Sequence, residues 1–192
     1  MFRKNKKKNL YKPISTKTIE EELNRINYKN KYNGVLRNTL YTIIIIAAAS
    51  AIIATLIMPV LQISGSSMEP LYSNGDIVVS FKTKNLSSGD IIAFYHGNKI
   101  LIKRVVAKSG EWVNIDKNGN VYVNGKMLEE DYLSVKDKGD SDIEFPYQVP
   151  DGSYFVLSDD RFDSIDSRNE DIGSIKKDDL VGKILFKVWP LK

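Results

Sequence analysis

The chain has 192 residues, enough for one domain with a hydrophobic core and an appended segment. It has no cysteine and a single histidine, His96, which excludes a disulfide framework, a thiol nucleophile and a multi-histidine metal site. The net charge of +4 is uneven, because residues 1–38 carry eleven Lys or Arg and three Glu, a balance of +8. Such a basic head favours an anionic membrane surface. The body lacks the basic stripe with interleaved aromatic residues that would indicate nucleic-acid binding.

An uncharged apolar run follows the basic head. No Asp, Glu, Lys, Arg or His lies between Asn38 and Met68. Because a bilayer core needs about 20 helical residues, the sequence predicts a transmembrane helix over residues 39–63. A buried core helix would show a polar face, and a cleaved signal peptide would have a shorter apolar run of roughly 7–15 residues. The positive residues before the span predict that residues 1–38 are cytoplasmic and residues 64–192 extracytoplasmic.

Beyond the span, the pattern changes to short runs of β-branched and aromatic residues. These runs are separated by turn signals such as Asn74-Gly75, Asn118-Gly119 and Asn124-Gly125. No convincing helical period occurs between them. The sequence therefore predicts a mainly β protein, in which an antiparallel or mixed all-β domain follows the single transmembrane helix. The predicted strands are residues 77–81, 90–95, 99–107, 111–115, 120–125, 153–158 and 183–189.

The first candidate for chemistry is a serine in a turn directly after the span. Residues 63–70 read ISGSSMEP, with Ser67 immediately before Met68. Such a turn can expose a hydroxyl beside backbone N–H groups, which an acyl-transfer nucleophile and its oxyanion hole require. The motif alone also fits a plain linker, so the interpretation depends on a base elsewhere in the chain.

Two residues are candidates for that base. A Ser-His-Asp triad would have to use His96, which lies in a predicted turn where a solvated histidine is expected. A Ser-Lys arrangement is the other option. Strand alternation places Lys103 on one face with Leu101, Val105 and Ala107. Burial there would lower the lysine pKa from about 10.4 toward the roughly 7–8 that a base needs, whereas a lysine extended to the sheet edge would stay charged.

A third feature is the polar segment SDDRFDSIDSR at residues 158–168. It could be only a solvated loop. Alternatively, its charged side chains could form a charge-assisted network that holds the loop in one shape and presents Ser164 to an amine. The residues of this possible network are Asp159, Arg161, Asp166 and Arg168.

Taken in order, these motifs resemble the type I signal peptidase family in its compact Gram-positive bacterial form. The resemblance covers roughly residues 40–190 and includes the family's C-terminal ending, Gly182-Lys183 and Trp189-Pro190. The other matching blocks are the N-terminal span, Ser67-Met68-Glu69-Pro70 followed by Gly75-Asp76, Gly89-Asp90-Ile91-Ile92-Ala93-Phe94, Ile102-Lys103-Arg104-Val105, and residues 159–168.

The resemblance implies a membrane-bound serine endopeptidase that removes signal peptides from exported preproteins, cutting after small residues at positions −1 and −3. It makes Ser67 the nucleophile and Lys103 the general base. The implied partners are preprotein signal peptides, membrane lipids and, transiently, the secretion translocase at the cell membrane. Members of the family need no metal or organic cofactor.

The resemblance also implies supporting residues. Ser164 would orient the lysine amine, in a loop supported by Asp159, Asp166 and Arg168. The oxyanion would be held by the Ser67 N–H, in a hole that includes Gly65. Some relatives carry a serine hydroxyl at the position of Gly65, so a hole assisted by the backbone is expected here.

Several positions depart from the family pattern. The family usually has threonine where Leu71 stands, and Ile-Gly-Leu-Pro-Gly-Asp where residues 106–111 read VAKSGE, including Lys108-Ser109. Its Gly-Asp-Asn-Arg is here Ser158-Asp159-Asp160-Arg161. We therefore expect a divergent member with narrower substrate choice. Two alternatives are a soluble Ser-Lys self-cleaving regulator with the same β fold, and an inactive membrane-anchored paralogue that acts as a partner of the export machinery.

Overall fold

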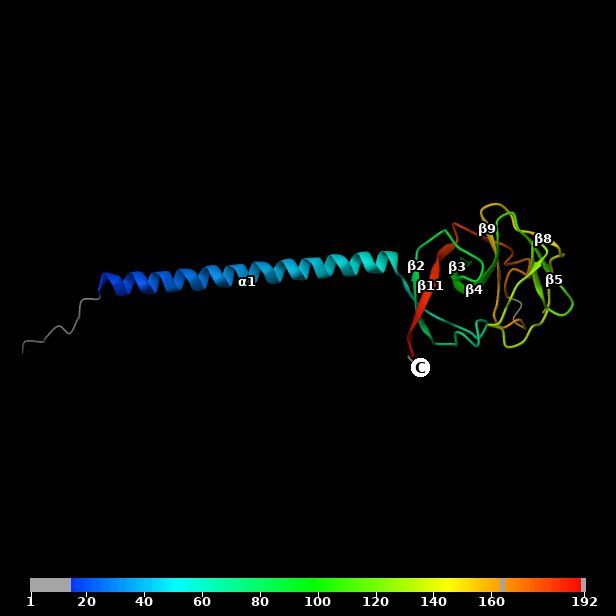
Figure 1. Cartoon of the computed structure of the whole chain (residues 1–192), viewed down its shortest axis with the longest axis horizontal. Helices are drawn as coiled ribbons and strands as arrows, with labels where there is room; N and C mark the ends of the chain where they lie inside the picture. Colours follow the sequence, from blue (N-terminus) through cyan, green and yellow to red (C-terminus); the bar gives the residue numbers. More distant parts are fainter. Residues whose placement is uncertain (1–14, 163–164, 191–192) are drawn as a thin grey trace, which may run out of the picture. The chain divides into compact units, whose positions relative to one another are not determined.

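The structure is a computed structural model that describes residues 15–162 and 165–190. The chain divides into two units, one ending at Ile52 and the other beginning at Ile53. Helix α1 (Thr16–Ile57) has 42 residues and none of them is buried (Figure 1). Its most apolar 18 residues have a mean hydropathy of 2.5, so the helix is long and apolar enough to cross a membrane.

The end of α1 differs from the predicted boundary at residue 63. The helix ends at Ile57, shortly before Pro59, and Val60–Gln62 form the short strand β1. Proline has no N–H to continue a helix, and the residue before it is biased away from the helical region. The apolar run therefore contains both the end of a helix and the first strand of the β body.

The larger sheet has seven strands in the order β1-β2-β11-β3-β4-β9-β10, and all neighbouring pairs are antiparallel. In Figure 1, β2, β11, β3 and β4 run side by side, as this order requires. The six strands besides β1 are β2 (Ile77–Phe81), β3 (Ile91–His96), β4 (Lys99–Lys108), β9 (Ser153–Leu157), β10 (Ile175–Lys176) and β11 (Leu180–Trp189).

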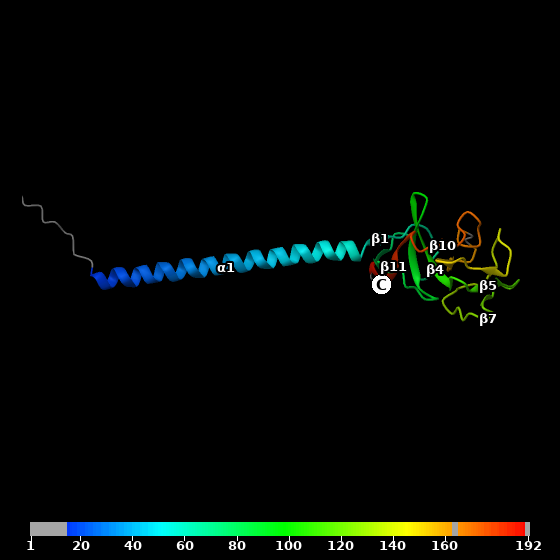
Figure 2. The same ribbon diagram turned by 90° about the horizontal axis from the view of Figure 1, so that it is seen from above.

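The smaller sheet has four antiparallel strands in the order β7-β6-β5-β8. Figure 2 shows β5 and β7 at one end of the β body, with β1 and β11 at the other. A two-residue turn, Asn124-Gly125, connects β6 to β7, and both residues have positive φ, as a type I′ hairpin turn requires. The four strands are β5 (Trp112–Ile115), β6 (Val121–Val123), β7 (Lys126–Met127) and β8 (Tyr147–Gln148).

The predicted fold class is confirmed: one N-terminal apolar helix is followed by an antiparallel β domain. Each of the seven predicted strands corresponds to an observed one, namely β2, β3, β4, β5, β6, β9 and β11. Four further strands of two or three residues each, β1, β7, β8 and β10, were not predicted.

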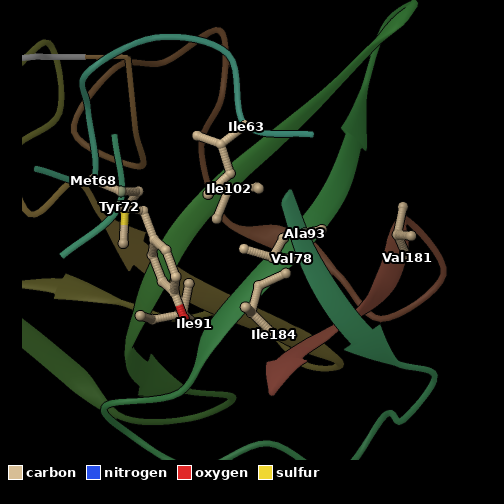
Figure 3. Packing of buried hydrophobic residues seen from close by; sticks show 9 residues of the cluster. All are labelled: Ile63, Met68, Tyr72, Val78, Ile91, Ala93, Ile102, Val181 and Ile184. Carbon is tan, nitrogen blue, oxygen red and sulfur yellow. The ribbon is translucent and has the colours of Figure 1, made fainter. Parts of the chain in front are cut away.

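Three clusters of buried apolar residues form the core. The first joins the segment after β1 to β2, β3, β4 and β11, and Figure 3 shows Ile63 and Met68 of that segment within it. The second packs the ends of β4 and β9 against the smaller sheet. The third lies along β3, β4 and β9 and includes Val105 and Val156. The first and third clusters contain the neighbours of the two candidate reacting residues.

Candidate active site

Ser67 lies in the turn after β1, between two residues anchored in the core. Ile63 and Met68 are both buried, and Figure 3 shows Ile63 near Ile102 of β4 and Met68 beside the ring of Tyr72. The Tyr72 N–H donates a hydrogen bond to the Met68 carbonyl at 2.9 Å. The turn that carries Ser67 is therefore held at both ends by packing against the seven-stranded sheet.

The three serines of this turn differ in exposure. Ser67 is half-buried, whereas Ser64 and Ser66 are exposed. The Ser67 carbonyl accepts a hydrogen bond from the Asp160 N–H at 3.0 Å, which ties the turn to the polar segment at residues 158–168.

Lys103 lies in the middle of β4 and is only 2% exposed. Its Nζ donates a hydrogen bond to Ser158 Oγ at 2.9 Å. Leu101 and Val105 pack in the third apolar cluster, while Ile102 packs in the first, so the predicted alternation holds around the lysine. The ammonium or amine group is thus buried among apolar neighbours with a hydroxyl beside it.

The alternation of side chains along β4 ends after Val105. The register between β4 and β9 shifts from Val105↔Val156 to Ala107↔Phe155, which leaves Val106 as an extra residue. Such a bulge reverses the side on which the following residue points. Ala107 consequently packs with Phe155 in the second cluster, so the prediction that it shares the face of Lys103 is wrong.

Ser67 and Lys103 line the same cavity, which has a volume of about 230 Å³. Its other walls are residues 60–64, Met68 and residues 100–102, so they come from the segment around β1 and from the start of β4. His96 is exposed at the end of β3 and does not line this cavity. The structure therefore brings the serine together with the lysine and leaves the histidine apart.

The charged residues of the polar segment form buried ion pairs, although not with each other in every case. Asp166 pairs with Arg168, as the network hypothesis allows. Asp159 pairs with Arg104 of β4, and Arg161 pairs with Glu130. Asp159 therefore pairs outside the predicted network, and Glu130, which the sequence pattern does not single out, is the partner of Arg161.

Tyr132 connects two of these ion pairs. The Arg104 guanidinium lies 3.9 Å from the centre of the Tyr132 ring, and the Tyr132 hydroxyl donates to Glu130 Oε1 at 3.0 Å. Burial and the neighbouring Glu130 carboxylate raise the pKa of the Tyr132 phenol well above its usual range. The segment after β7 is thereby tied to β4 and to residues 158–162.

Ser158 connects the Asp166–Arg168 pair to Lys103, because its backbone bonds to Asp166 and its side chain contacts the lysine. The Ser158 N–H donates to Asp166 Oδ2 at 2.9 Å, and Arg168 Nε donates to Asp166 Oδ1 at 2.9 Å. Ser164, the residue predicted to orient the lysine, lies outside the described residues. The sequence places Ser158 at the start of the polar segment and at a departure from the family pattern, but neither feature predicts its contact with Lys103.

The backbone of the turn bears on the predicted oxyanion hole. The Gly65 N–H donates to Asn74 Oδ1 at 3.1 Å, so it is already engaged. Within residues 15–162 and 165–190, no acceptor is recorded for the Ser67 N–H. Gly65 has a φ of 97°, a conformation that side chains disfavour, so its role in the turn is conformational. No group of three potential metal ligands occurs in the described part of the chain.

A family model described as "Signal peptidase, peptidase S26" matches residues 36–189. The chain belongs to this family. It is a serine peptidase of the signal peptidase I type, and its reaction is the cleavage of signal peptides. The predicted family and enzyme class are confirmed.

Relatives of this signal peptidase include signal peptidase IB of Staphylococcus aureus strain COL, 36% identical over 160 residues that cover 72% of this chain and 82% of the relative. A probable signal peptidase I-2 of Synechocystis is 31% identical over 168 residues, covering 81% of this chain and 73% of that protein. A crystal structure of a signal peptidase I from Enterococcus faecalis matches with 32% identity and a TM-score of 0.44, over 55% of this chain and all of that chain.

Proposed function

We propose that this signal peptidase cleaves preproteins with a Ser67/Lys103 dyad. The observation that carries the proposal is the single cavity that both side chains line. Burial of Lys103 among apolar residues disfavours the ammonium form, and only the neutral amine can take the Ser67 hydroxyl proton. The exposed position of His96 outside the cavity favours the lysine as base.

The reaction then proceeds through an acyl-enzyme. Ser67 Oγ attacks the scissile carbonyl carbon while its proton passes to Lys103 Nζ, and the resulting oxyanion accepts a hydrogen bond from the Ser67 N–H. The Lys103 ammonium next protonates the leaving amine, which releases the mature protein. Lys103 finally accepts a proton from water as that water attacks the ester carbonyl, and it returns this proton to Ser67 Oγ when the bond from Oγ to the acyl carbon breaks. The engaged N–H of Gly65 leaves Ser67 as our choice of oxyanion donor.

Two strand edges beside the cavity support binding of an extended substrate. β1 pairs only with β2 among the described residues. β4 pairs with β9 from Arg104 onward, so Lys99–Ile102 have no strand partner on that side in the described part of the chain. An extended peptide can add to such edges as a strand, and its residues at −1 and −3 would then face the same way.

We further propose that α1 anchors the enzyme in the cell membrane, with residues 1–38 cytoplasmic, the apolar part of α1 from residue 39 to Ile57 crossing the bilayer, and the β body from Val60 onward forming an extracytoplasmic catalytic domain. The apolar helix and the +8 charge of the head support this orientation. Membrane lipids and, transiently, the secretion translocase would then be its partners. Protease added to intact protoplasts should digest residues 64–192 and spare the head, and a protected C-terminal body would contradict the orientation.

The dyad is tested with the detergent-solubilised full-length protein and a preprotein, with the cut site determined by mass spectrometry. The wild type should cut after a residue preceded by small residues at −1 and −3. Ser67→Ala should lower the rate roughly 10⁴-fold or more. Ser66→Ala, an exposed neighbour outside the cavity, should keep most activity. A folded Ser67→Ala variant that still cleaves would contradict the assignment, and a wild type that never cleaves would favour an inactive paralogue.

A further inference from the structure

Ser158 is a buried serine at the end of β9 whose hydroxyl contacts the proposed base. It is fully buried, and its Oγ lies 2.9 Å from Lys103 Nζ. The contact joins β4 to the residue that follows β9.

Hydrogen bonds from the Ser158 backbone to Asp166 and Arg161 fix the position of this residue. Its N–H donates to Asp166 Oδ2, and Arg168 holds the same carboxylate through Nε and Nη2. Its carbonyl accepts a hydrogen bond from Arg161 Nε at 2.9 Å. All three of these charged residues are buried, so the Ser158 backbone is held by groups that cannot exchange their partners for water.

We propose that Ser158 is a positioning residue for Lys103: its Oγ accepts one N–H of the amine and keeps the amine lone pair directed toward Ser67. The inference rests on the proposed Ser67/Lys103 dyad and adds a residue to it. A neutral lysine amine has two N–H groups and one lone pair, and it can rotate about the Cε–Nζ bond. An acceptor fixed on one N–H restricts that rotation and so selects the orientation in which the lone pair can take the serine proton.

The same contact has a predictable effect on pH dependence. An ammonium group donates a stronger hydrogen bond than a neutral amine, so the Ser158 hydroxyl stabilises the charged form of Lys103. Removing the hydroxyl should therefore make deprotonation easier. The acid limb of the kcat profile should move to lower pH, even though the maximal rate falls because the amine is less well oriented.

The test compares full-length wild type, Ser158→Ala and Ser158→Thr in detergent, measuring kcat and KM for one preprotein across the pH range. Ser158→Ala should lower kcat roughly 10–100-fold with little change in KM, and should shift the acid limb to lower pH. Ser158→Thr keeps a hydroxyl and should restore most of kcat. A folded Ser158→Ala variant with wild-type kcat and an unshifted acid limb would overturn the proposal, as would a folded threonine variant no faster than alanine.

Ser167→Ala is the matched structural control. Ser167 is equally buried in the same loop, and its Oγ accepts a hydrogen bond from the Val156 N–H at 2.9 Å. Its loss should lower stability without moving the acid limb, and an equal shift in both variants would refute the specific role of Ser158. Lys103→Met separates the two hypotheses. If it abolishes cleavage while Ser158→Ala behaves as wild type, only the Ser158 inference fails, whereas an active Lys103→Met would refute the dyad itself.

Discussion

The two sheets of the β body differ in what they bury. In the four-stranded sheet, every buried strand residue is apolar, namely Val113, Ile115 and Val121. The seven-stranded sheet buries two basic side chains at adjacent positions of β4, Lys103 and Arg104. The loop after β9 adds four buried acidic or basic side chains, which are Asp159, Arg161, Asp166 and Arg168.

The difference shows that acidic and basic side chains are buried around the proposed active site and not throughout the β body. Apolar contacts suffice for the smaller sheet, so buried charge is not a requirement of this β body. A buried ion pair adds little net stability compared with apolar residues of similar size, but removing one partner is costly. The pairs around Lys103 are therefore best explained by the single geometry that they impose on β4 and residues 158–168.

Asp166→Ala should have the largest effect on stability. It leaves the Arg168 guanidinium buried without its carboxylate and removes the acceptor of the Ser158 N–H. We expect a loss of about 3–5 kcal/mol in the free energy of unfolding, with a lower cleavage rate. Denaturant unfolding followed by circular dichroism measures the free energy of unfolding, and a preprotein assay measures the cleavage rate.

The control for this variant is Asp142→Ala. Asp142 is an exposed carboxylate that accepts a hydrogen bond from Asn169 at 2.9 Å. Its removal should change the free energy of unfolding by about 0.5 kcal/mol or less. If Asp166→Ala had the free energy of unfolding and the cleavage rate of the wild type, residues 158–168 would behave as an ordinary surface loop. The buried ion pairs would then not explain the difference between the two sheets.

Glu130→Gln should have a smaller effect. Glutamine keeps an oxygen that can accept from Arg161 but loses the charge that balances the buried guanidinium. We expect a loss of about 1–3 kcal/mol in the free energy of unfolding. The neighbouring Glu129 is exposed, so Glu129→Gln is a matched control with little expected change. Equal stability of the two variants would show that the Glu130 charge is not needed to anchor the loop.

The smallest effect is expected in the four-stranded sheet, where the polar contacts lie at a turn. The side-chain amide of Asn120, together with backbone N–H groups of Asn118 and Asn120, lowers the pKa of Asp116. Because the pKa of Asp116 is lower in the folded state, its ionised carboxylate stabilises the folded protein at pH values above the ordinary aspartate pKa of about 3.9. This stabilisation is lost as the pH falls through the pKa of the folded state.

Asp116→Asn should therefore remove a small part of the pH dependence of the melting temperature below about pH 4, measured by thermal unfolding. Wild type and variant should have similar cleavage rates at neutral pH. An identical acid dependence of melting in both proteins would show that the turn contributes nothing that titrates, and a large loss of activity would break the distinction between the two sheets.

Much of the fold was predictable, and the failures have physical reasons. Runs such as IVVSF and KILIKRVVA are long enough for their β-branched composition and alternation to predict strands. β7, β8 and β10 have two residues each, too few for any periodicity. β1 is hidden because Val60–Gln62 continue the apolar run of the span, and only Pro59 indicates that the helix ends there.

The site was predictable where its residues lie in short motifs. Ser67 and Lys103 were singled out by a turn and a strand, and the structure brings them to one cavity. Glu130 lies 31 positions before Arg161 in a polar stretch that resembles any solvated loop, so only the folded chain identifies this pair. The face of Ala107 was mispredicted because a bulge depends on pairing with β9, which local sequence does not contain.

The central claim is that Lys103 acts as a base, and Lys103→Arg tests it most directly. Arginine keeps the positive charge but does not lose its proton in a protein. The measurement is kcat/KM for preprotein cleavage by folded wild type and Lys103→Arg. We expect kcat/KM to fall roughly 10⁴-fold or more in Lys103→Arg, and by a similar factor in Lys103→Met. Substantial cleavage by Lys103→Arg would contradict the dyad and would leave His96 as the alternative base.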